Sequence, residues 1–212
     1  TRKAFGVTPH LNLSGTMPLI GDVSPDCPPS YLSCLLDPEN SDGWIKTLKI
    51  DDSLALNKLR PKLDFIEGKS VVLDGWWRTD CNGWSVIGFV APNGWSPMPG
   101  HGHNDIGGFE LHYKNVQVFC DLGRRSYGPA GDQDVASNSH NTLMIDGTAC
   151  YPPNKSYYDD DFRISLIKKP PEIICEEGLV TLKTSAFSRL IKVGNWKRSW
   201  RIDQEKIEIV DL

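Results

Sequence analysis

The sequence has no apolar run of about 18 residues, so it contains no candidate for a transmembrane helix. It also has no excess of basic residues: 23 Lys and Arg against 27 Asp and Glu give a net charge of −4, which argues against nucleic acid as a partner. Its six cysteines form no C-x-x-C pair, which argues against zinc-ribbon and thioredoxin-like motifs. What remains is an ordinary globular chain of 212 residues, long enough for one domain and part of another.

The character of the chain changes near residue 68. Residues 1–30 are rich in Pro, Gly, Ser and Asp and predict an ordered loop or linker, and residues 31–65 contain two stretches with helical spacing. After Gly68, short β-branched and aromatic stretches alternate with turn residues and predict roughly nine strands without intervening helices. We therefore expect loops and short helices over 1–68 and a mainly β domain, an antiparallel β-sandwich, over 69–212.

Several strands make specific predictions. Trp76 and Trp77 are adjacent, so they should point to opposite faces of their strand. Cys120 alternates with Val116 and Val118 and is expected to be a small buried residue. The stretch "NTLMIDG", residues 141–147, is expected to form a strand of its own.

The chain concentrates its histidines: four of five lie between His101 and His140, and "GHGHNDIGGFEL" over 100–111 carries two of them. In an extended chain His101 and His103 point to the same side. Two imidazoles and a carboxylate, here Asp105 or Asp121, make a three-ligand zinc site with a position left for water. The competing interpretation is that these histidines hydrogen-bond to the backbone of a glycine-rich loop.

Three ligand patterns stay open. His103 and Asp105 with His140 would make an H-x-D…H facial triad, although His140 follows closely in sequence. A cupin pattern would need Glu110, which lies far from His103 and lacks the usual following glycine. The third set is His103, Asp121 and His140.

The third set requires a bend in the chain. If "YKNV" over 113–116 is a hairpin turn, Phe109 pairs with Cys120 and Gly108 pairs with Asp121. His103 would then lie about 16 Å beyond Asp121 along a straight strand. The site closes only if the chain bends at Gly107–Gly108, where two glycines permit it.

The segments "GHGHNDIGGFEL", "VFCDLGRRSYG" and "SHNTLMIDG" resemble the C-terminal domain of heparinase II/III-type polysaccharide lyases. Upstream "GTMPLIGDV" and downstream "NWKRSWRI" and "IEIVDL" resemble flanking segments of that family in the same order. The chain departs from the usual pattern by Gly108 in place of Ser, by Leu122 in place of Pro, and by "GDQDVASNS" where basic and aromatic residues are common.

The resemblance implies a two-part enzyme in which an N-terminal (α/α) toroid packs against the sandwich and the cleft between them binds acidic polysaccharide. Residues 1–65 would be the end of the helical part. It further implies a structural zinc held by His103, Asp121 and His140, and it favours a periplasmic or secreted location. Because groups that neutralise the substrate carboxylate would lie in the toroid, the chain alone is expected to be weak or inactive.

For catalysis, the resemblance implies that His101 faces the cleft near the bond that breaks and that Tyr127 serves as base or acid. Arg124 and Arg125 follow Asp121 and could bind a uronate carboxylate through their guanidinium groups. The expected reaction is β-elimination of a uronic-acid-containing polysaccharide. Two alternatives remain: a non-catalytic carbohydrate-binding sandwich with a purely structural metal, and a cupin-like metalloenzyme.

Overall fold

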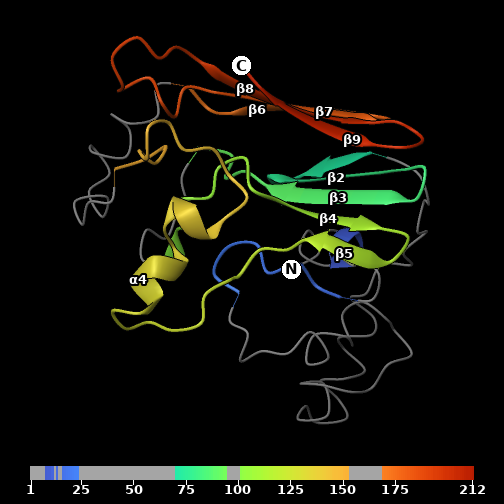
Figure 1. Ribbon diagram of the computed structural model, residues 1–212, viewed down its shortest axis with the longest axis horizontal. Helices are drawn as coiled ribbons and strands as arrows, with labels where there is room; N and C mark the ends of the chain where they lie inside the picture. Colours follow the sequence, from blue (N-terminus) through green and yellow to red (C-terminus); the bar gives the residue numbers. More distant parts are fainter. Residues whose placement is uncertain (1–7, 12, 14–15, 24–69, 95–100, 153–168) are drawn as a thin grey trace, which may run out of the picture.

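The computed structural model describes residues 8–11, 13, 16–23, 70–94, 101–152 and 169–212, and within them two antiparallel sheets stack face to face (Figure 1). The first sheet has the order β1-β2-β3-β4-β5, and its strands span Val71–Leu73, Trp76–Cys81, Trp84–Phe89, Phe109–Tyr113 and Val116–Phe119. The second has the order β6-β7-β8-β9, with strands Glu172–Glu176, Leu179–Thr184, Trp196–Ile202 and Ile207–Asp211. The predicted mainly β sandwich is confirmed.

Among the described residues, helical structure is confined to short pieces: the 3-10 helices η1 (Thr8–Leu11) and η4 (Ser137–Ser139) and the single-turn helix α4 (Gly131–Asp134). The expectation of no helix between the strands is therefore wrong for α4 and η4. No helix within the described ranges has the length and apolar character that crossing a membrane requires. The helices expected between residues 31 and 65, and with them the toroid remnant, lie outside the described residues.

Two-residue turns join the first strands into a meander. The turn Asp74–Gly75 has φ of 49° and 90°, Asn82–Gly83 has 51° and 83°, and Lys114–Asn115 has 47° and 67°. Positive φ at both central residues is the requirement of the type I′ hairpin turn, which Asp-Gly and Asn-Gly meet at low cost. Each strand therefore pairs with its sequence neighbour, and β3 and β4 lie side by side beneath the second sheet.

The main core lies between the sheets and is built around aromatic rings. The ring centroids of Trp77 from β2 and Trp200 from β8 are 4.5 Å apart, and Phe109 from β4 meets Trp200 edge-on at 5.9 Å. Gly88 makes room for this packing, because a Cβ at that position would lie 2.3 Å from the Trp77 ring. These aromatic contacts stabilise the packing of the two sheets and hold the first sheet in place.

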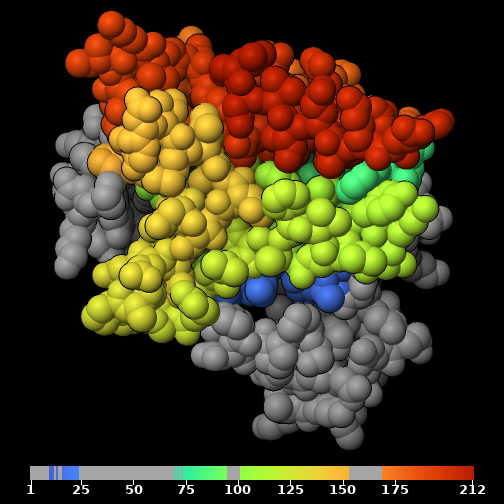
Figure 2. All heavy atoms as spheres, in the orientation of Figure 1, coloured from blue at the N-terminus to red at the C-terminus, as the bar shows by residue number. Residues whose placement is uncertain are grey.

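The outer face of the first sheet is covered by the described part of residues 8–23, which Figure 2 shows in blue below β4 and β5. Leu13 and Ile20 pack there against Ile87, with Trp76 and Phe89 at the edge of the cluster. Trp77 faces the core between the sheets, so the predicted opposite orientation of Trp76 and Trp77 is confirmed. The described part of the expected linker thus covers the sheet.

The β4–β5 hairpin departs from the expected register. Tyr113 pairs with Val116 as predicted, but a bulge shifts the ladder so that Leu111 pairs with Phe119. The expected pairings of Phe109 with Cys120 and of Gly108 with Asp121 are therefore wrong, because the extra residue on β5 moves every later partner by one.

Burial at β5 also differs from expectation. Cys120 is exposed, since β5 is an edge strand whose four residues are all exposed. Cys81, Cys150 and Cys175 are free thiols like Cys120, and the remaining two cysteines lie outside the described residues.

The strand expected at 141–147 is also corrected, since this stretch forms only one isolated bridge, between Ile145 and Thr148. Asn141 explains the difference, because its amide donates to the carbonyls of Phe109 and Cys120 at 3.0 and 2.8 Å. The segment is therefore tied across the end of the β4–β5 hairpin by a side chain.

Candidate metal centre and catalytic site

The chain bends between Asp105 and Phe109, as the closure of the site required. Gly107 has a φ of +75°, and the Gly108 N–H donates to the Asp105 carbonyl at 2.6 Å, closing a tight turn. A Cβ on Gly107 would lie 2.7 Å from the Trp196 ring, so both the backbone angle and the space call for glycine. The predicted bend is confirmed.

Arg198 of β8 fastens this bend to the segment that follows His140. Its Nη1 donates to the carbonyls of Gly107 and Asn141, both at 2.9 Å, while Nε and Nη2 pair with Asp211 at 2.8 Å. The guanidinium is only 5% exposed. One buried cation thus joins the two chain segments that carry the histidines.

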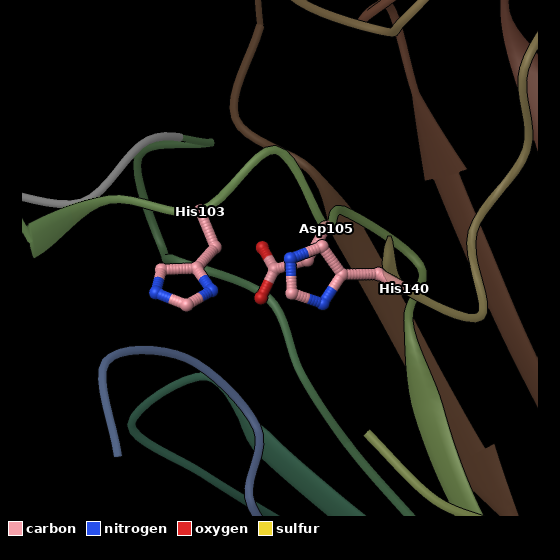
Figure 3. Close-up of side chains that lie close together, drawn as sticks. All are labelled: His103, Asp105 and His140. Atoms are coloured by element: carbon pink, nitrogen blue, oxygen red, sulfur yellow. The ribbon is translucent and has the colours of Figure 1, made fainter. Parts of the chain in front are cut away.

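His103, Asp105 and His140 gather at the end of the first sheet, with the carboxylate of Asp105 between the two imidazoles in the view of Figure 3. Their possible ligand atoms all lie within 4.8 Å of one another. Ligand atoms on a tetrahedral zinc are about 3.4 Å apart, so modest side-chain rotations would bring this group to binding geometry. These are the residues of the H-x-D…H pattern.

Unsatisfied nitrogens support a cation at this place. Both ring nitrogens of His103 and Nε2 of His140 are buried and find no hydrogen-bond partner among the described residues. Buried polar atoms without a partner are uncommon, since each lost hydrogen bond to water is a cost to folding. A bound metal would supply the missing interaction, so the residues present fit a metal ion.

Asp121 contacts His140 directly: its two oxygens lie 3.0 and 2.9 Å from Nδ1, and both side chains are fully buried. A carboxylate in this place can accept the Nδ1 proton and leave Nε2 as the ligand atom, or bind the metal itself. Asp121 is outside the tight three-residue group, and Glu110 of the cupin pattern is too. Both candidate carboxylates therefore lie next to the expected histidines, Asp105 within the tight group and Asp121 on His140.

The pKa shifts in the cluster differ in sign, and that of His103 favours metal binding. Burial, helped by the neighbouring His140, lowers the pKa of His103 to about 4, so its ring is neutral near pH 7 and one nitrogen has a free lone pair. Burial raises the pKa of Asp105 to about 6. Burial opposes protonation of His140 as well, but the hydrogen bond and charge of Asp121 outweigh it and raise the His140 pKa.

The two expected catalytic residues meet at Asp22. Its Oδ2 accepts a hydrogen bond from the Tyr127 hydroxyl at 2.9 Å and also contacts Nδ1 of His101. The rings of His101 and Tyr127 are 6.1 Å apart and edge-on, and both side chains are largely open to solvent. Sequence reasoning gave Asp22 no role, although it ends the "PLIGD" part of the segment whose resemblance was noted.

The electrostatics of this group are dominated by the Asp22 carboxylate. Burial alone would raise the pKa of Asp22, but hydrogen bonds from His101 and Tyr127 and the charge of Arg124 outweigh it and lower the pKa. The same hydrogen bond, with smaller contributions from burial and charge, raises the pKa of Tyr127. Tyr127 therefore keeps its proton at neutral pH and can act as an acid.

A cavity of about 230 Å³ lies between these two groups. Asp22, His101, His103 and Asp105 line it on the polar side. Its apolar wall includes Trp76, Phe89 and Val90. An aromatic wall opposite polar side chains is the usual composition of a small-ligand site.

The family described as heparinase II/III-like, C-terminal, matches residues 66–212. The chain belongs to this family. Among solved structures, it is similar to a heparan sulfate lyase HepC mutant from Pedobacter heparinus (17% identity, TM-score 0.56, 95% of this chain and 30% of that one). It is also similar to a heparinase III with methylated lysines (16% identity, TM-score 0.51, 96% and 30%). No curated protein matches its sequence.

This heparinase II/III-like chain spans 30% of the length of each of those two structures, and at such identities the likeness shows the fold alone.

The two arginines expected to bind substrate have different surroundings. Arg124 is 9% exposed and stacks on Tyr127 at 4.2 Å, with Nη1 3.5 Å from Asp22 Oδ1. Arg125 is exposed, and its backbone N–H and Nε each donate to the Asp134 carboxylate at 2.9 Å. Arg124 thus joins the Asp22 group, while Arg125 is held by Asp134.

Proposed function

We propose that the chain is the sandwich part of a polysaccharide lyase that cleaves uronic-acid-containing polysaccharide by β-elimination, working with an (α/α) toroid domain. The observation that carries this proposal is that His101 and Tyr127 share one carboxylate, that of Asp22, and that Asp22 and His101 line a cavity together with His103. Membership of the heparinase II/III-like family supports the reaction class.

In the proposed reaction, a base removes the proton alpha to the sugar carboxylate, the electron pair forms a carbon–carbon double bond, and the glycosidic oxygen leaves with a proton from an acid. His101 is the base, because its ring lines the cavity and is 48% exposed. Tyr127 is the acid, because its raised pKa keeps the hydroxyl protonated. Arg124 adds positive charge beneath Tyr127, which favours an anionic substrate.

His103 and His140, with Asp105 or Asp121, would hold a zinc ion in this proposal. A bound zinc would join the segment before the Gly107 bend to the segment that ends at His140, and so stabilise the loop that carries His101. Its role is structural. The proton transfers are left to His101 and Tyr127.

The test is a lyase assay on the full-length protein that contains this chain, with several uronate polymers, following ultraviolet absorbance of the unsaturated product. Wild type should form product, and His101→Ala should lose about 10²–10⁴-fold in kcat. The matched control is Asp132→Asn, an exposed residue of α4. If sugars bind but no polymer yields unsaturated product, the chain is a carbohydrate-binding module and the proposal is wrong.

A further inference from the structure

The acidic residue between His101 and Tyr127 has no role in the reaction as written above. We propose that Asp22 is the positioning residue of the site, holding His101 and Tyr127 in one arrangement and fixing which nitrogen of His101 accepts the substrate proton. Its kinetic consequence rests on the proposed function; the contact with His101 can be tested without it.

Among the described residues, Asp22 is surrounded by ring nitrogens, a hydroxyl and a guanidinium group. Its Oδ2 contacts Nδ1 of His101 and accepts a hydrogen bond from the Tyr127 hydroxyl. Its Oδ1 lies 3.5 Å from Arg124 Nη1 and 3.7 Å from His103 Nε2. The side chain is only 13% exposed. One carboxylate therefore connects the open catalytic pair with the buried cluster behind it.

The segment that carries Asp22 is fastened on both sides. The Leu19 N–H donates to Glu110 Oε1 at 2.7 Å, and the Arg124 N–H donates to the Val23 carbonyl at 3.0 Å. Gly123, with a φ of +60°, lets the chains approach, since a Cβ there would lie 2.4 Å from the Val23 oxygen. These contacts hold Asp22 next to the His101 ring, although the two residues are 79 positions apart in the sequence.

The carboxylate determines the tautomer of His101. An ionised carboxylate only accepts hydrogen bonds, so Nδ1 of His101 must carry the hydrogen, and the lone pair of the neutral ring lies on Nε2. In Asp22→Asn, the Arg124 cation near Oδ1 favours the amide oxygen there and turns the NH₂ group toward His101. Nδ1 would then become the acceptor and Nε2 would hold the hydrogen, so the base would be blocked while the shape of the site stays the same.

The first measurement is nitrogen-15 NMR of the histidine rings in this chain, with the His101 signal identified by its loss in His101→Gln. We expect Nδ1–H for His101 in wild type and in the control Asp132→Asn, and Nε2–H in Asp22→Asn. The second is kinetics of the full-length protein. There, Asp22→Asn should lower kcat about 10²-fold or more and leave KM within about 2-fold, and Asp22→Glu should restore part of kcat.

The outcomes separate the two proposals. A changed tautomer together with a lower kcat supports the positioning role of Asp22. An unchanged tautomer overturns it whether or not the protein is active, and so does a changed tautomer with an unchanged kcat in an active enzyme. If wild type shows no lyase activity, the proposed function fails, and the NMR result alone decides whether Asp22 sets the state of His101.

Discussion

Replacing Arg198 should destabilise the protein far more than replacing Arg201, although both arginines lie on β8. Arg198 is 5% exposed and makes four hydrogen bonds, two to the Asp211 carboxylate and one each to the carbonyls of Gly107 and Asn141. Among the described residues Arg201 pairs only with Glu208, at 3.8 Å, and both of those side chains are well exposed.

The size of the effect follows from what each substitution leaves behind. Arg198→Met leaves the carbonyls of Gly107 and Asn141 without this hydrogen-bond donor. Each buried carbonyl that loses its partner destabilises the folded state by about 1–3 kcal/mol. Asp211 loses its cation, but it is 28% exposed and still accepts from Trp196 Nε1, so it adds less. The two carbonyls together give about 2–6 kcal/mol, a range that includes the loss of about 3–5 kcal/mol typical of a broken buried ion pair. Arg201→Met should cost about 0–1 kcal/mol, as exposed pairs do.

Urea unfolding of wild type and of the two variants measures the difference in free energy. Because the Arg198 bonds hold the Gly107 bend beside the segment after His140, Arg198→Met should also bind metal more weakly than Arg201→Met. Equal losses of stability in the two variants would refute the reasoning, since it would mean that the buried hydrogen bonds of Arg198 contribute no more than an exposed pair.

Two further predictions concern the same region. Burial raises the pKa of Glu110 to about 7 against two backbone hydrogen bonds, so the folded state keeps a proton that the unfolded state loses above about pH 4.5. The free energy of unfolding should therefore fall by about 3 kcal/mol as pH rises from 4.5 to 7. Glu110→Gln keeps the acceptor oxygen but cannot titrate, so unfolding measured against pH should show a flatter slope for this variant. An unchanged slope in Glu110→Gln would contradict the prediction. Gly107→Ala should lower the free energy of unfolding by on the order of 3 kcal/mol, because Gly107 has a positive φ and an added Cβ would clash with Trp196. Gly194→Ala is the control and should change stability little, because nothing lies within 4 Å of the added Cβ. Equal melting temperatures of the two variants would contradict the prediction.

Much of the fold could be read from local pattern. The dipeptides Asp74–Gly75 and Asn82–Gly83 set the first two hairpins, and the alternation at Trp76 and Trp77 assigns each ring to its own face. The bend at Gly107 was also predictable, because glycine pairs permit it and the site could not close otherwise.

Tertiary context decided the remainder. Alternation gives the two faces of β5 but not whether either is covered, so Cys120 was expected to be buried and is exposed at a sheet edge. One extra residue in β5 shifted the ladder, and periodicity does not locate such a bulge. The amide of Asn141 replaced an expected strand with side-chain bonds.

The histidine cluster was found from sequence because its members are rare residues set close together. Asp22 was missed because it is a common residue far from His101 in the chain, and only the packing of residues 8–23 on the sheet brings the two together. Asp105 and Asp121 could not be ranked, since the choice depends on side-chain geometry at the bend.

The most direct test of the central claim, a metal-binding cluster behind a catalytic pair, is metal analysis of the purified chain. Wild type is compared with His103→Ala and His140→Ala, and with His10→Ala as a histidine outside the cluster. We predict about one zinc per chain in wild type and in His10→Ala, lost in the other two together with thermal stability. Iron in place of zinc would favour the facial triad with Asp105. No metal in wild type, with both cluster variants as stable as wild type, would contradict the account.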